Sequence, residues 1–254
     1  MQTDLIIKKH FEKSMKDYEK NAIVQSMMAS KMMIELCKIS TDFEYVLELG
    51  CGTGLLTKKI LNDLKFKKYY ANDLIEKSKN YVQKIIPNSQ FLCGSALKIR
   101  PTKKMDLIIS NAMFQWFGNL DKAIEILKRS LNKGGILAFS TFGPENFKEI
   151  NALTGLSLNY KTKDEIVEIL QKQGFEVLYA ENFYEELTFK TPLELLAHMK
   201  NTGVNSLSEK TWTITKVKEF CDKYSKMYPK SKLTYSPIVV IARWTKVDKS
   251  QLNK

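Results

Sequence analysis

The sequence predicts an α/β protein built on a mostly parallel, doubly wound sheet, and three observations support this. Short apolar segments alternate with helical segments between about residues 45 and 141. The segment 105–110 is almost entirely apolar, as expected for a strand covered on both faces. A glycine-rich run at 50–54 joins an apolar strand to a helical pattern. Strands separated by helices in this way pair in parallel.

The first elements follow from apolar periodicity and from residues that end helices. Residues 8–38 are expected to form an N-terminal helix, because Val24, Met28 and Met32 recur at helical spacing and would face the core. Pro87 should end the expected helix at 74–86, and residues 132–135 should end the expected helix at 120–131. Strands are expected at 45–49, 68–73, 89–93, 105–110 and 136–141, and helices at 54–64, 74–86 and 120–131.

The pattern loosens after residue 142. The segment 143–160 is expected to be irregular or partly helical, and the later elements are helices at 163–173, 191–203 and 208–228 and strands at 175–187 and 233–244. The two strands would form a closing hairpin if helices at about 190–230 did not separate them. We interpret that insertion, together with the N-terminal helix, as a lid. The chain, 1–254, should form one domain with a flexible tail at 247–254.

Composition sets further limits on the class of protein. The chain has 254 residues, of which 44% are hydrophobic, enough for a full core. Its four cysteines are scattered, which argues against a zinc or disulfide framework and favours a reducing cytoplasm. We expect no bound metal. The sequence shows neither a signal peptide nor an apolar run of transmembrane length.

The net charge of +12 favours an acidic partner. Lysine greatly outnumbers arginine, whereas proteins that read base sequence rely on arginine forks. The charge therefore favours an acidic protein over nucleic acid, although lysines that only solvate the surface would give the same composition. The expected oligomeric state is a monomer.

The glycine run carries the strongest chemical signal. Glu48 is followed by Gly50, Gly52 and Gly54 in the pattern E-x-G-x-G-x-G. A dinucleotide site would need glycine or alanine at Leu55, and a P-loop would need G-x-x-x-x-G-K-S/T, which is missing. The pattern resembles the first motif of class I S-adenosylmethionine-dependent methyltransferases; the alternative is a structural glycine turn. The resemblance implies a Rossmann-like sheet and a bound methyl donor.

The resemblance also implies roles for two acids. Glu48 ends the first strand and would accept a hydrogen bond from the ammonium group of the donor. Asp73 ends the second strand, where an acid accepts from both ribose hydroxyls; the alternative is a helix N-cap. Ser95 departs from the acid often found there to receive the adenine amino group. The expected donor contacts are Gln25, Glu48, Gly50, Cys51, Gly52, Gly54, Asp73, Leu74, Ser95, Ala96 and Asn111.

Several segments narrow the resemblance further. The run S-N-A-M-F-Q-W-F at 110–117 is similar to a motif of the malonyl-acyl carrier protein O-methyltransferases, which open biotin synthesis. The N-terminal pattern at 11–25, the run S-T-F-G-P-E-N-F-K-E at 140–149, and the segments 195–203 and 233–235 are also similar to that family. The resemblance implies methylation of the free carboxylate of malonyl on an acidic acyl carrier protein.

A carboxylate acceptor is already ionised at neutral pH, so the enzyme needs alignment and exclusion of water more than a base. The residues expected to position this acceptor are Tyr18, Gln115, Trp116 and Arg243. Each has a plain alternative: packing for the first three, and a solvated strand end for Arg243. His10 and His198 are expected to be structural or surface residues. Lys200, Lys210 and Lys216 of the lid are candidates for steering the carrier protein.

Two other functions remain open from the sequence. One is methylation of another small molecule, by a trans-aconitate-type or quinone-type methyltransferase that would share the donor site. The other is a protein that binds the donor without catalysis. The intact glycine run and Asp73 argue against this second function.

Overall fold

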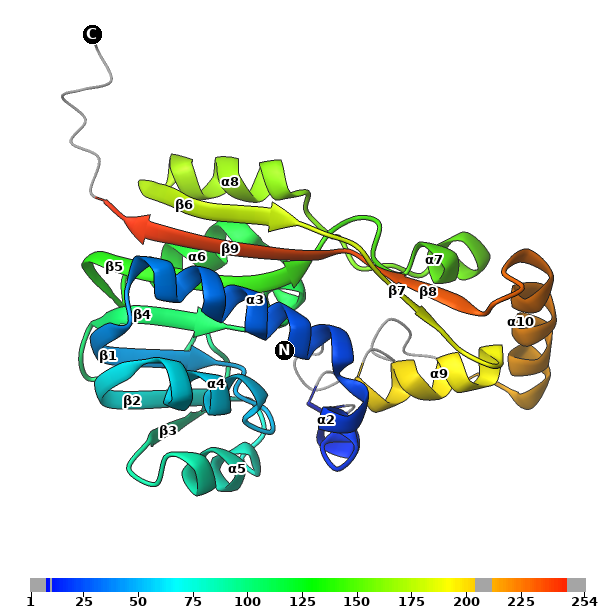
Figure 1. The fold of residues 1–254 in the computed structure, drawn as a ribbon, viewed down its shortest axis with the longest axis horizontal. Coiled ribbons are helices and arrows are strands. Elements are labelled where there is room, and N and C mark those ends of the chain that lie inside the picture. Colours follow the sequence, from blue (N-terminus) through cyan, green and yellow to red (C-terminus); the bar gives the residue numbers. More distant parts are fainter. Residues whose placement is uncertain (1–7, 10, 204–211, 246–254) are drawn as a thin grey trace, which may run out of the picture.

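The computed structural model describes residues 8–9, 11–203 and 212–245, and it is organised around a seven-stranded sheet (Figure 1). The strand order is β3-β2-β1-β4-β5-β9-β6, and β1 to β5 pair in parallel while β9 is antiparallel to both neighbours. The strands are β1 Asp42–Leu49, β2 Lys65–Asp73, β3 Gln90–Cys93, β4 Met105–Ser110, β5 Leu131–Phe142, β6 Phe175–Asn182 and β9 Pro237–Trp244. The predicted fold class is therefore confirmed.

Helices cover both faces of this sheet. On one face lie α3 Ile23–Ile39, α4 Leu55–Asp63 and α5 Ser78–Ile85; on the other lie α6 Leu120–Lys128 and α8 Lys163–Lys172. The side chains of β4 alternate between the two faces. Leu107 and Ile109 pack in the core under α3, α4 and α5, and Ile108 packs in the core under α6 and α8. Met28 and Met32 of α3 are fully buried, as their spacing predicted.

The N-terminal helix is not continuous, contrary to expectation. Residues 8–9 and 11–14 are helical, α2 covers Tyr18–Asn21, and α3 begins at Ile23. The break falls at Ala22, whose backbone is not helical (ψ +47°) and which is fully buried. This change of direction turns the residues before α3 toward the carboxyl ends of the strands.

The two closing strands are each divided in two. The predicted strand at 175–187 is β6 followed by β7 Glu185–Thr188, and the strand at 233–244 is β8 Lys232–Tyr235 followed by β9. The segments β7 and β8 leave the main sheet and pair only with each other. Ser236 lies at the division, where its carbonyl accepts a hydrogen bond from Gly143 N–H and its hydroxyl accepts one from Asn182 Nδ2.

This two-stranded ribbon carries the expected helical insertion. The helices α9 Pro192–Asn201 and α10 Ile214–Met227 lie between β7 and β8, at the far end of the ribbon from the main sheet (Figure 1). A third core joins the insertion to α3 and to α7 Lys148–Thr154. Its buried members include Leu195, Phe220 and Tyr235. The expected segments 208–211 and 247–254 lie outside the described residues, as do His10 and Lys210.

Within the described ranges, no helix is both long and apolar enough to cross a membrane. All four cysteines are free thiols.

Candidate active site

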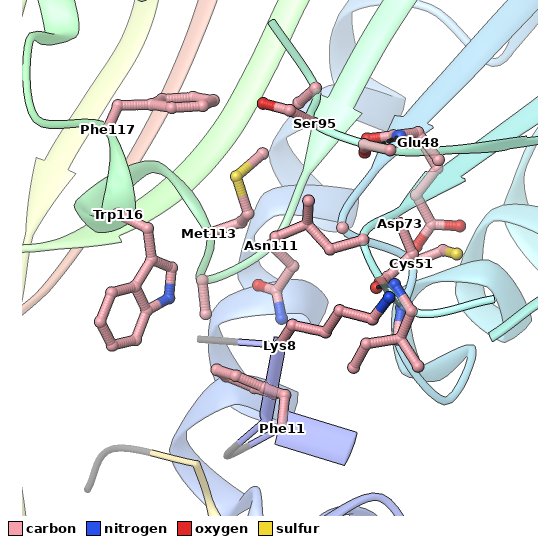
Figure 2. A pocket seen from close by; sticks show the side chains of 18 of the residues that line it. Lys8, Phe11, Glu48, Cys51, Asp73, Ser95, Asn111, Met113, Trp116 and Phe117 are labelled. Carbon is pink, nitrogen blue, oxygen red and sulfur yellow. Dashed lines mark hydrogen bonds between the residues drawn. The ribbon is translucent and has the colours of Figure 1, made fainter. Parts of the chain in front are cut away.

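A cavity of about 550 Å3 opens at the carboxyl ends of β1, β2 and β4, where ligands of parallel α/β sheets bind. Figure 2 shows Glu48, Cys51 and Asp73 on one side of it and Met113 and Trp116 on the other. The N-terminal segment closes part of the cavity with its own side chains. The lining residues from that segment are Lys8, Phe11, Ser14, Met15 and Tyr18.

The glycine loop after β1 has the shape that its sequence predicts. Gly50, Gly52 and Gly54 all have positive φ, at +67°, +53° and +85°. A Cβ atom on Gly54 would lie 2.4 Å from Cδ1 of Ile85, so this glycine lets α4 and α5 approach each other. A Cβ on Gly52 would meet no atom within 4 Å, which shows that the cavity is open beside this loop.

Glu48 lies at the inner end of the cavity with 1% of its surface exposed. Its Oε2 accepts hydrogen bonds from Thr57 Oγ1, at 2.6 Å, and from the hydroxyl of Tyr69. Burial raises the pKa of the Glu48 carboxyl to about 7, although both hydrogen bonds oppose the shift. The acid is therefore held in place by its own neighbours and titrates near neutral pH.

Asp73 ends β2 and holds two loops together. Its Oδ2 accepts from Gly52 N–H and its Oδ1 accepts from Ile75 N–H, each at 2.8 Å. Burial raises the pKa of this carboxyl, and the two backbone donors oppose the shift. The alternative role of a helix N-cap is wrong, because α5 begins at Ser78 and its N-cap position is Lys77.

Asn111 follows β4 and lines the cavity. Its Nδ2 donates to the carbonyl oxygen of Gln25 at 3.0 Å, and its Oδ1 accepts from Ser140 Oγ at 2.7 Å. The same Ser140 hydroxyl accepts from Ala112 N–H at 2.9 Å, where φ of Ala112 is +51°. This network joins β4, β5 and α3 and fixes the backbone on the floor of the cavity.

The structure gathers most of the expected donor contacts around this cavity. Those that line it are Glu48, Gly50, Cys51, Gly52, Asp73, Leu74, Ser95, Ala96 and Asn111. Two others are not lining residues. Gly54 faces Ile85 of α5 and not the cavity. Gln25 is buried on α3, and its carbonyl oxygen accepts the hydrogen bond from Asn111 Nδ2. The side-chain Oε1 of Gln25 has no hydrogen-bond partner among the described residues.

The expected acceptor residues fare differently. Tyr18 and Trp116 line the cavity, and the ring of Phe11 lies 6.0 Å from that of Tyr18 and 6.2 Å from that of Trp116. Gln115 points elsewhere, because its Nε2 donates to the carbonyl oxygen of Ala112 at 2.6 Å. Burial raises the pKa of Tyr18, with the nearby Asp73 as a second cause, so its hydroxyl stays protonated.

Arg243 does not reach the cavity, so its expected role with a carboxylate is wrong. It pairs with Ile136 in the first half of β5, and the antiparallel direction of β9 puts it toward the amino-terminal edge of the parallel strands. Its Nη1 lies 3.9 Å from Oε2 of Glu176 on β6. The solvated strand end was the correct alternative.

Sequence reasoning missed several lining residues. Lys8, Met113 and Phe117 all contribute to the wall. The last two fall inside the S-N-A-M-F-Q-W-F run, so their place next to the named residues was the available signal. Phe11 belongs to the N-terminal pattern, but nothing in its spacing distinguished a lining residue from a core residue.

His198 is buried in the lid and not at the surface. Its Nε2 lies 2.7 Å from the hydroxyl of Tyr235, and desolvation lowers its pKa to about 4, so the ring is neutral. Burial, followed by the neighbouring Tyr18, raises the pKa of Tyr235. The structural role expected of His198 thus holds, because it ties α9 to β8.

Comparisons with known proteins agree with this geometry. The model of a family described as "Methyltransferase domain" matches residues 47–139. Malonyl-acyl carrier protein O-methyltransferase of Calditerrivibrio nitroreducens is 37% identical over 240 residues, which cover 93% of this chain and 96% of that protein. The protein of the same name from Haemophilus influenzae is 34% identical over 248 residues, covering 95% of each chain.

A solved S-adenosylmethionine-dependent methyltransferase from Clostridium acetobutylicum shares the fold, with a TM-score of 0.54 and 13% identity. The match covers 89% of this chain and 96% of that one. The two relatives of the same name match nearly the full length, including the segments that form the lid. This chain therefore belongs to the malonyl-acyl carrier protein O-methyltransferase family.

Proposed function

We propose that this protein transfers a methyl group from S-adenosylmethionine to the free carboxylate of malonyl carried on acyl carrier protein, the reaction for which its relatives are named. The supporting observation is that identity to these relatives extends over almost the whole chain while the glycine loop, Asp73 and Tyr18 line one cavity. The product, a malonyl methyl ester, would prime chain elongation toward biotin in the cytoplasm.

The residues of the cavity fit a donor of this kind. Thr53 Oγ1 is buried in the lining without a hydrogen-bond partner among the described residues, and the space beside Gly52 is open. In our proposal the Asp73 carboxylate accepts hydrogen bonds from the ribose hydroxyls, and Leu74, Ser95 and Ala96 surround the adenine. Glu48 and the floor around Asn111 would hold the methionine end. Bound there, the donor supplies an electrophilic methyl group on a positively charged sulfur.

The acceptor needs little acid–base assistance. A malonyl carboxylate is ionised at neutral pH, so one of its oxygens can form the new bond to the methyl carbon directly. The carbon–sulfur bond breaks at the same time, and its electron pair stays on sulfur, which becomes a neutral thioether. No proton moves in this step. His198, the one histidine among the described residues, is buried outside the cavity lining, which agrees with chemistry that needs no base.

The protein's part is to orient the carboxylate and exclude water. Tyr18 can donate its hydroxyl proton to a carboxylate oxygen, because its raised pKa keeps that proton in place. The ring of Phe11 lies next to Tyr18 and the ring of Trp116 lies next to Phe11, and both rings line the cavity. In such an enclosed site a positioned hydroxyl would align the oxygen with the methyl group.

The test is methyl transfer from labelled S-adenosylmethionine to malonyl-acyl carrier protein, with succinyl-acyl carrier protein and trans-aconitate as matched acceptors. We expect label on the malonyl carrier alone, in a base-labile ester. Equal transfer to trans-aconitate would favour a methyltransferase for small acids. Donor binding without transfer to any acid would refute the proposal and favour a binding protein.

A further inference from the structure

A second, smaller cavity lies between the connection from β3 to β4 and the end of α6. Its volume is about 270 Å3. The chain contains only the arginines Arg100, Arg129 and Arg243, and the first two line this cavity. We call it the basic groove; its lining residues are Arg100, Pro101, Thr102, Lys103, Lys104, Ile126, Arg129 and Ser130.

The basic groove adjoins the active-site cavity. Ile126 lines both, and Lys122 lines the active-site cavity one helical turn earlier on α6. Because Lys122, Ile126 and Arg129 lie on successive turns, they share one face of the helix. Lys98, on the facing loop, also lines the active-site cavity. Positive side chains therefore lie both at the rim of the active site, at Lys98 and Lys122, and in the adjoining groove.

Little of this charge is neutralised by the protein itself. Arg129 pairs with Glu125 at 2.5 Å, but both side chains are exposed. Lys98, Lys103 and Lys104 are exposed and form no ion pair within the described part of the chain. Elsewhere on the surface, lysines such as Lys67 and Lys77 have acidic partners at 2.8 Å and 2.7 Å. The groove thus keeps an excess of cations that lack internal partners.

The loop that carries these cations is already ordered. Arg100 Nη1 donates to the carbonyl oxygens of Ile99, at 2.7 Å, and Leu97, at 3.3 Å. The hydroxyl of Thr102 lies 3.3 Å from that of the buried Tyr70. Leu97 and Ile99 also pack against the core on the α6 side of the sheet. A partner would meet a preformed surface and would lose little free energy in ordering it.

We propose that the basic groove is the docking surface for the acidic acyl carrier protein, an inference that rests on the proposed function. Several separated cations along one path match a row of carboxylates better than they match one phosphate group. The lining contains no aromatic side chain on which a base could stack, which disfavours single-stranded nucleic acid. Docking there places the partner beside the rim at Lys98 and Lys122, next to the cavity in which methyl transfer takes place.

The experiment reverses the groove charges without touching the active-site lining, in the triple variant Arg100→Glu/Lys103→Glu/Lys104→Glu. The matched variant Lys216→Glu/Lys223→Glu/Lys226→Glu makes the same change on exposed lysines of α10 in the lid. Rates are measured with malonyl-acyl carrier protein and with malonyl-pantetheine, which carries the same acceptor group and no protein. A milder variant, Lys103→Ala/Lys104→Ala, guards against misfolding of the triple variant.

We expect kcat/KM for the carrier-protein substrate to fall by about tenfold or more in the groove variant, with a weaker dependence on salt. Its kcat/KM for malonyl-pantetheine should stay at the wild-type value, and the alanine variant should show a smaller loss of the same kind. Unchanged kinetics in the groove variant, or an equal or larger loss in the lid variant, would overturn the docking proposal.

Failure of the proposed function gives a different result. Wild-type protein would then methylate neither malonyl substrate, or only malonyl-pantetheine. Direct binding of malonyl-acyl carrier protein, measured by calorimetry on the wild type and both triple variants, decides the docking proposal in that case. Equal binding by all three proteins, or no binding by the wild type, would overturn it.

Discussion

Asp73 accepts a hydrogen bond from the backbone N–H of Gly52 at 2.8 Å, and this contact joins the end of β2 to the glycine loop after β1. The same carboxylate fixes Ile75 N–H on its other side. One side chain therefore shapes two walls of the cavity in addition to any contact with the ribose. Asp73 is thus both the proposed ribose-binding residue and a part of the scaffold that shapes the cavity.

Replacing Asp73→Ala should weaken S-adenosylmethionine binding by about 1–3 kcal/mol, because hydrogen bonds to the ribose and to the loop are lost together. Calorimetric titration with the donor measures this change. Asp63→Ala, an exposed acid at the end of α4, should leave donor affinity unchanged. Wild-type affinity in Asp73→Ala would mean that another group holds the ribose.

Glu48 predicts a specific dependence of stability on pH. Its folded-state pKa of about 7 lies above the ordinary value of 4.5, so between these pH values the folded protein binds more protons than the unfolded chain. The free energy of unfolding therefore falls as pH rises through this window. In Glu48→Gln this contribution to the pH dependence is removed. The free energy of unfolding of the variant should therefore rise relative to that of the wild type as the pH rises from about 5 to about 8.

Urea unfolding of both proteins at about pH 5 and about pH 8 measures the effect. The exposed acid Glu219 provides the control, because Glu219→Gln should follow the wild-type curve. Parallel pH curves for wild type and Glu48→Gln would show that the buried carboxyl keeps an ordinary pKa in the folded state.

Gly54 and Gly118 form a matched pair for testing backbone strain. Gly54→Ala places a side chain at φ +85° and within 2.4 Å of Ile85, so it should destabilise the fold by about 1–2 kcal/mol or more. Gly118→Ala meets no atom within 4 Å and has no positive φ, so its stability should stay close to wild type. Thermal unfolding compares the two variants, and equal midpoints would refute the argument.

Tyr18→Phe tests the acceptor side of the cavity. Loss of one hydrogen bond to a charged group, about 1.5–3 kcal/mol, should lower kcat/KM for the malonyl substrate by about tenfold or more. Donor affinity should not change, because the ring and its contact with Phe11 remain. Tyr184→Phe, at a tyrosine with 59% of its surface exposed, is the control. Full activity of Tyr18→Phe would remove this hydroxyl from the mechanism.

The parts of the fold that the sequence predicted are those fixed by local signals. The apolar run at 105–110 and the spacing of Gly50, Gly52 and Gly54 each depend on a single strand or turn, and both lie where expected. Most residues expected to contact the donor line one cavity for the same reason, since parallel strands bring their carboxyl ends together at one edge.

The sequence predictions that were wrong concern features that depend on neighbouring strands. Gly134 and Gly135 were expected to end a helix, but they lie in β5 where its register against β4 shifts. Gly134 has φ +80°, and a Cβ on Gly135 would lie 3.0 Å from the carbonyl oxygen of Met105. A glycine pair ends a helix or forms a bulge with the same residues, so only the neighbouring strand distinguishes them.

Arg243 was misplaced for a related reason. An apolar strand pattern does not reveal the direction in which the strand runs. Because β9 is antiparallel, its end lies beside Ile136, in the first half of β5 and away from the cavity. The division of both closing strands near Ser236 was equally hidden, since it depends on hydrogen bonds from Gly143 and Asn182.

The ribbon of β7 and β8 has a consequence for how the protein opens. The lid helices are attached through two strands that continue directly from β6 and β9, not through flexible loops. Phe183 N–H donates to the carbonyl oxygen of Pro237 at 3.0 Å and carries backbone pairing across the junction. Displacing the lid would therefore twist the ribbon and disturb the main sheet. Amide hydrogens of β7 and β8 should therefore exchange with solvent as slowly as those of the sheet edge, because opening the ribbon would also open the main sheet.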